Sequence, residues 1–171
     1  TQKNIAPGFS FLSVPSDLKD NAEVIEFGPT YGVGVDKDGY VYEWGQLTKN
    51  LKKIPADMGK VVDIAVGQDH VLAINDKGNL YTWGFNRMGL NVIPPELKGK
   101  KIADIEAGYQ VSVVVTEDGK VVSWGNTSAV DISTANVKDE KVKEVKANIQ
   151  TAIALTKDGK VISLAKKETA L

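Results

Sequence analysis

The sequence predicts an all-β protein built from four copies of one unit about forty residues long. A glycine in a turn-like context recurs at steps of 39, 41 and 40 residues: Gly39, Gly78, Gly119 and Gly159. A large apolar residue follows at the same steps: Trp44, Trp83, Trp124 and Leu164. Units of this length stack, so that each buries its apolar face against its neighbours.

Positions upstream of the turn also repeat. Eleven residues before each turn glycine stand Gly28, Gly67, Gly108 and Asn148, and three residues earlier stand Ile25, Ile64, Ile105 and Val145. Further upstream come Val14-Pro15, Ile54-Pro55 and Ile93-Pro94, with Ile132-Ser133 in the last copy. We therefore expect one domain over residues 1–171, with repeats at about 15–45, 54–84, 93–125 and 132–165.

Each unit shows the alternation of β-strands. Apolar residues at every second position place one set of side chains on one sheet face. The pairs are Val33 and Val35, Leu72 and Ile74, Val113 and Val115, and Ile153 and Leu155. Glycine then closes a hairpin, because it accepts the positive φ of a short turn. Three strands run up to the Trp-Gly position, and we expect a fourth near the next Ile-Pro, since proline fits a strand end.

Composition indicates a compact globular protein without strong charge. The net charge is −1, with 42% hydrophobic and 25% charged residues, so no nucleic-acid partner is expected. The absence of cysteine excludes disulfides and thiolate chemistry. No apolar run approaches the roughly eighteen residues of a membrane span, and the first four residues are polar. Neither membrane insertion nor a signal peptide is predicted, and no compartment is specified.

The second unit carries the most distinctive pattern. Residues 64–74 read IAVGQDHVLAI and residues 77–90 read KGNLYTWGFNRMGL. This unit resembles a repeat of the regulator of chromosome condensation family. The first and third units keep the glycine, turn and Trp-Gly positions, whereas the fourth keeps the apolar frame and the turn. The resemblance implies β-propeller blades of four antiparallel strands each.

The chain also departs from this family. Family propellers commonly have seven blades, whereas this chain encodes four. The nucleotide-exchange activity of the founding member depends on surface loops of a full ring, including an extra hairpin outside the repeat. No such insertion is found here, so we do not extend exchange activity to this chain.

The last unit differs from the others. Leu164-Ala165 replaces Trp-Gly, and Asn148 replaces the upstream glycine. Residues 9–14 provide a spare N-terminal strand that could complete the last blade. This arrangement favours a closed ring of four blades over an open arc whose exposed faces are covered by another subunit.

No catalytic or metal-binding set emerges from the residues. His70 is the only histidine, and the other copies place Tyr31, Val111 and Thr151 at its position. We therefore expect His70 to hydrogen-bond a neighbouring loop rather than bind metal. The sequence predicts no enzyme activity and no cofactor.

The repeated residues are interpreted as structural. Identical placement of the three tryptophans indicates packing between blades rather than a ligand surface. The glycines upstream of the turn and in the turn are assigned the same structural role.

Function is expected where the copies differ, in the links after Trp-Gly at residues 46–53, 85–92 and 126–131. Phe85, Arg87 and Met88 combine an aromatic ring, a cation and a thioether, which is a composition enriched in interface cores. We interpret them as a partner-binding loop of a non-enzymatic interaction or structural module, such as an accessory subunit of a larger assembly. A protein partner or self-association is expected. The alternative is a propeller that binds a small ligand or glycan in a cleft.

Overall fold

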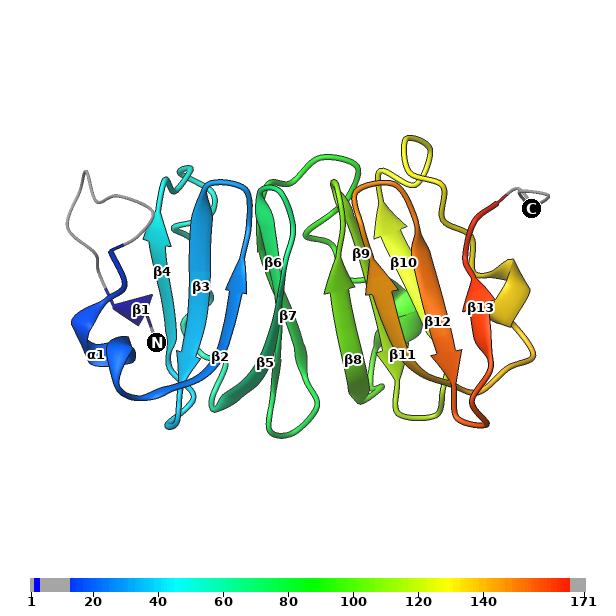
Figure 1. Cartoon of the computed structure of the whole chain (residues 1–171), viewed down its shortest axis with the longest axis horizontal. Coiled ribbons are helices and arrows are strands. Elements are labelled where there is room, and N and C mark those ends of the chain that lie inside the picture. Colours follow the sequence, from blue (N-terminus) through cyan, green and yellow to red (C-terminus); the bar gives the residue numbers. More distant parts are fainter. Residues whose placement is uncertain (1, 4–12, 167–171) are drawn as a thin grey trace.

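The computed structural model describes residues 2–3 and 13–166, which form four antiparallel sheets standing in a row (Figure 1). Each sheet contains three consecutive antiparallel strands, with the second strand in the middle. The strands are β2 (Ala22–Phe27), β3 (Tyr31–Asp36) and β4 (Val41–Gly45); β5 (Val61–Val66), β6 (His70–Asn75) and β7 (Leu80–Gly84); β8 (Ile102–Ala107), β9 (Val111–Thr116) and β10 (Val121–Gly125); β11 (Val142–Ala147), β12 (Ala152–Thr156) and β13 (Val161–Ser163). The all-β prediction is confirmed.

The sheets share one register as well as one order. In every sheet the pairing of the first two strands shifts at the same place, between Ala22 and Val24 in the first sheet and between Val142 and Glu144 in the last. A shift of this kind leaves one residue unpaired and increases the local twist. The repeat therefore extends to the backbone irregularities.

The expected fourth antiparallel strand does not form among the described residues. Two of the three Pro-containing links instead contain short helical turns, α1 (Ser16–Lys19) and the 3-10 segment η1 (Pro95–Leu97). The link around Ile54-Pro55 forms neither a helix nor a strand, and the last link contains the 3-10 segment η2 (Ala135–Val137). The first sheet gains only β1 (Gln2–Lys3), which pairs with β4 in parallel. Proline has a fixed φ near −65° that suits the start of a helix, which accounts for the turns that follow Pro15 and Pro94.

The described residues form an open arrangement rather than the closed ring that the sequence favours. The first and last sheets lie at opposite ends of the row, and extensive contacts join successive sheets (Figure 1). Of the strand expected at 9–14, residues 9–12 lie outside the described residues, and Ser13 and Val14 are not in a strand. No helix among residues 2–3 and 13–166 is long and apolar enough to cross a membrane.

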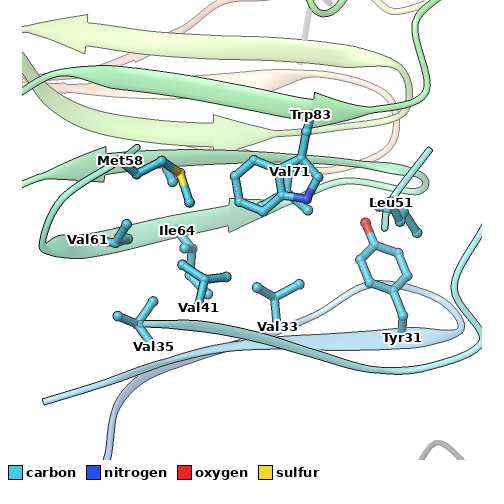
Figure 2. Close-up of a cluster of buried hydrophobic side chains, with 11 residues drawn as sticks. Tyr31, Val33, Val35, Val41, Leu51, Met58, Val61, Ile64, Val71 and Trp83 are labelled. Carbon is cyan, nitrogen blue, oxygen red and sulfur yellow. The ribbon is translucent and has the colours of Figure 1, made fainter. Parts of the chain in front are cut away.

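The core lies between the sheets, in one cluster for each pair of neighbours. Figure 2 shows Val33, Val35 and Val41 of the first sheet facing Ile64 and Trp83 of the second. Each such side chain contributes about 1.5–3 kcal/mol when it is fully buried. The interfaces between repeats therefore hold the row together.

Candidate interaction surface

Tyr31 and His70 occupy the same repeat position and tie each repeat to the next one. The Tyr31 hydroxyl donates to the carbonyl of Gly67 at 2.8 Å and lies 3.2 Å from that of His70. His70 is buried, and its Nε2 hydrogen-bonds Ser112 Oγ in the third sheet at 3.1 Å. Burial lowers the pKa of His70 to about 4, so the ring is neutral at pH 7.

The three tryptophans lie at equivalent positions with different partners. Trp83 Nε1 donates to Glu43 Oε2 at 3.5 Å, and Trp124 Nε1 donates to the Leu90 carbonyl at 2.8 Å. Trp44 packs with Leu18 and Tyr42 on the first sheet, and its Nε1 has no acceptor in the described part of the chain. Trp83 and Trp124 thus reach across to the preceding repeat, whereas Trp44 packs within its own.

Glu43 is a buried residue that the sequence interpretation missed. It is 2% exposed, and burial raises the pKa of its carboxyl to about 8. Oε1 has no hydrogen-bond partner among the described residues. The other repeats carry Thr82, Ser123 and Ser163 at this position, so the single acidic exception was the available signal.

The turns between the first and second strands of all four sheets meet around one cavity. Gly28, Gly67 and Gly108 line a cavity of about 250 Å³ with Asn148, and all four repeats contribute to its wall. A Cβ at Gly67 would lie 2.8 Å from the Gly108 carbonyl oxygen of the next repeat, and one at Gly108 would lie 2.9 Å from the Asn148 carbonyl oxygen. The close approach of the repeats therefore requires glycine. The cavity is smaller than the roughly 300–1,000 Å³ typical of small-molecule sites.

Carboxyl groups from the first strands of the first three sheets gather at one cleft, beside Lys146 of the fourth sheet. Asp63, Asp104 and Glu106 line a cleft of about 100 Å³ together with Lys146. Desolvation raises the pKa of each of these carboxyl groups. Asp104 accepts the backbone N–H of Val145 at 2.8 Å, and Glu106 lies 3.5 Å from Lys146 Nζ. These contacts join neighbouring repeats. Among the described residues, no three His, Cys, Asp or Glu side chains are placed so that they could hold a metal ion.

Hydrogen bonds and one buried side chain fix the 85–92 loop where it joins the second sheet. Leu90 is fully buried, and Asn91 Nδ2 donates to the Gly84 carbonyl at 2.8 Å. The backbone N–H of Asn91 also bonds Asn86 Oδ1 at 3.1 Å. Because Leu90 also accepts from Trp124, the loop is anchored between the second and third repeats.

The tip of the same loop displays the three residues singled out from the sequence. The Arg87 guanidinium carbon lies 6.0 Å from the centroid of the Phe85 ring, which is within the range of a cation–π contact. Met88 is 61% exposed and has a φ of +57°, a conformation uncommon for a residue with a side chain. The structure therefore brings Phe85 and Arg87 together and leaves Met88 exposed beside them.

The stacked sheets and their shared register define a repeat protein of the β-propeller type. The Regulator of chromosome condensation (RCC1) repeat family matches this chain at residues 61–90 and 102–128, which cover most of the second and third repeats. The resemblance to this family's repeats is confirmed.

Relatives and solved structures agree with this assignment. The chain is 31% identical over 132 residues to the mouse E3 ubiquitin-protein ligase HERC2, covering 59% of this chain and 3% of HERC2. It is 27% identical to the Arabidopsis thaliana ultraviolet-B receptor UVR8, covering 69% of this chain and 30% of UVR8. The chain thus spans less than a third of these relatives.

Two solved structures show the same fold. Human WBSCR16 superposes with a TM-score of 0.73 at 18% identity, covering 84% of this chain and 47% of that one. Prp20p from Saccharomyces cerevisiae superposes with a TM-score of 0.65 at 22% identity, covering 92% of this chain and 46% of that one. In each case this chain corresponds to nearly half of the other chain.

Proposed function

We propose that this protein is a non-enzymatic protein-interaction module, an accessory subunit of a larger assembly, which binds a protein partner through the 85–92 loop. The observation that carries the proposal is the exposed Met88 next to the cation–π pair of Arg87 and Phe85, on a loop whose base is fixed by hydrogen bonds. Aromatic residues, Met and Arg are enriched in interface cores. A held loop also loses little conformational freedom on binding, which favours affinity.

Similar proteins give this proposal further support. One solved structure with the same fold is that of Kap60 bound to yeast RCC1 (Prp20), at 21% identity. A study of Prp20p concerns its binding to Gsp1p and histones. The cavity lined by Gly28, Gly67 and Gly108, at about 250 Å³, gives little support to the alternative of a small-ligand or glycan site at that place.

The test uses a natural partner purified together with the protein. The double variant Arg87→Ala with Met88→Asn removes the cation and the thioether, and asparagine tolerates the left-handed backbone at position 88. We expect the dissociation constant to rise about tenfold or more, as for the loss of interface hot spots. Isothermal titration calorimetry measures this change.

The matched control changes the corresponding link of the first repeat. Lys49 and Lys52 are exposed in the 46–53 link, and their replacement with alanine should leave the affinity unchanged. Unaltered binding by the Arg87 and Met88 double variant would overturn the proposal.

A further inference from the structure

The three interfaces between successive repeats share one backbone contact. The carbonyl of each turn glycine accepts an N–H from the first strand of the next repeat: Gly39 from Val61 at 3.2 Å, Gly78 from Ile102 at 3.0 Å, and Gly119 from Val142 at 2.9 Å. Each hairpin turn therefore rests directly on the sheet that follows it.

The same interfaces share an apolar pairing. Val33, Leu72 and Val113 occupy one repeat position on the middle strands, and none of them is exposed. Each lies in one cluster with the isoleucine or valine of the next repeat: Ile64, Ile105 and Val145, which are at most 3% exposed. One half of every interface thus comes from a middle strand and the other half from the next first strand.

The last repeat exposes the half of this interface that a middle strand provides. Ile153 occupies the position of Val33, Leu72 and Val113, yet it is 46% exposed, and Val161 on β13 is 69% exposed. A Cβ built at Gly159 would have no described atom within 4 Å, whereas at Gly39 it would come within 2.5 Å of Lys60 in the next repeat. The last turn therefore lacks, within the described chain, the neighbour that the earlier turns have.

The first repeat exposes the other half of this interface, the half that a first strand provides. Ile25 occupies the position of Ile64, Ile105 and Val145 and is 56% exposed. It lines a cavity of about 530 Å³ with Val14, Leu18 and Trp44 among others. At the internal interfaces the corresponding link residues, Met58 and Leu97, belong to the clusters between sheets. This cavity is therefore an interface of the internal kind with one side open.

We propose that a second copy of this chain packs its last repeat against the first repeat of this copy, and that two such head-to-tail contacts close a two-copy ring. The open face around Ile153 and Val161 is the type of surface that covers Ile64 and Ile105 inside the chain. The chain also superposes on 46–47% of two propeller chains, so two copies span about one such chain. A head-to-tail contact closes a ring when its rotation allows.

This inference goes beyond the proposed partner loop, because it uses different residues and a different readout. The first measurement is the mass of the protein in solution, by sedimentation equilibrium from about 1 to roughly 100 μM, which detects contacts with dissociation constants of about 100 μM or tighter. We expect a species of twice the 18.4 kDa chain mass with no larger assembly. A monomer throughout, or an open-ended polymer, would overturn the proposal, and a monomer would leave the open faces to a different protein or to flanking repeats.

Single variants test the two faces. Ile25→Asp and Ile153→Asp each place a carboxylate in both contacts of the ring, so each variant should be monomeric, with affinity weakened about a hundredfold or more. Both side chains are about half exposed, so the far-UV circular dichroism and the thermal midpoint of the monomer should be retained. Val62→Asp is the matched control, because Val62 is 39% exposed on β5 and the last repeat carries Lys143 at its position.

Mixing the two variants tests the head-to-tail arrangement. The Ile25→Asp chain keeps an intact last repeat and the Ile153→Asp chain keeps an intact first repeat, so one unaltered contact should form between them. We expect a one-to-one heterodimer although each variant alone is a monomer. If the mixture stays monomeric, or if only one of the two variants loses the dimer, the contact is not head-to-tail and the proposal fails.

Discussion

Glu43 shows how one residue can depart from the repeat at an energetic cost. It lies between the first two repeats, where Trp83 donates to one of its oxygens. The other repeats have a hydroxyl side chain at this position, and a hydroxyl group is neutral, so its burial does not require removing a charge from water. Because burial disfavours the charged carboxylate, its pKa rises from 4.5 to about 8.

The raised pKa makes the stability of the protein depend on pH. The folded protein holds the Glu43 proton up to about pH 8, whereas the unfolded chain releases it near pH 4.5. The contribution of Glu43 to the free energy of unfolding therefore falls as the pH rises between these two values. Glu43→Gln keeps the shape of the side chain and removes the titration.

We expect Glu43→Gln to gain stability over the wild type as the pH rises from 5 to 9, by on the order of 3 kcal/mol. Urea unfolding at pH 5, 7 and 9 measures the difference. Glu23→Gln, on the exposed part of β2, controls for the loss of one surface carboxylate. Parallel stability curves for Glu43→Gln and the wild type would contradict this account.

At the scale of the element, the Trp-Gly pair has a backbone explanation. Gly45, Gly84 and Gly125 end the third strand of the first three sheets with φ values of +94°, +107° and +104°. At Gly84 a Cβ would lie 2.5 Å from the Asp69 carbonyl oxygen. The glycine lets the chain leave the sheet close to the preceding hairpin.

Gly84→Ala should therefore destabilise the protein by about 2–4 kcal/mol, because it combines the left-handed conformation with a backbone clash. Gly99→Ala is the matched variant, since Gly99 has a φ of +73° but no described atom within 4 Å of its Cβ position. It should lose about 1 kcal/mol. Thermal unfolding measures both, and equal losses would show that the clash at Gly84 has no effect.

The hairpins and the helical turns differ in how far the sequence predicted them. Each hairpin is specified locally, by alternating apolar residues and a turn glycine, so comparison of the copies located all four. The Ile-Pro links were wrongly expected to be strands, because proline suits both a strand end and a first helical turn. In the helical form, Leu18 packs with Tyr42 and Trp44 of the first sheet, and Leu97 lies in the cluster between the second and third sheets.

At the scale of the whole molecule, the number of repeats was predictable and the closure of the ring was not. The count follows from the spacing of the turn glycines. Closure depends on the angle between neighbouring sheets, which is set by many side chains in each interface and has no signature in a single repeat. The burial of Glu43 was missed for the same reason, since its cover comes from the neighbouring repeat.

The arrangement of the sheets in a row predicts which repeats unfold separately when one interface between repeats is weakened. Stability in a stacked repeat protein is approximately a sum of repeat terms and nearest-neighbour interface terms. Trp83 lies in the cluster between the first and second sheets, and Trp124 lies in the cluster between the second and third. Each Trp→Ala substitution should weaken one interface by about 3–5 kcal/mol.

We expect Trp83→Ala to speed amide hydrogen exchange mainly in β3, while β9 and β12 keep their protection. Trp124→Ala should instead let the first two repeats open separately from the last two, so that β3 and β6 lose protection together. Exchange measured by mass spectrometry on monomeric protein distinguishes the two patterns. Nearest-neighbour coupling localises the effect of each substitution. A uniform loss of protection across β3, β6, β9 and β12 in both variants would therefore contradict it and show that the four repeats unfold as one unit.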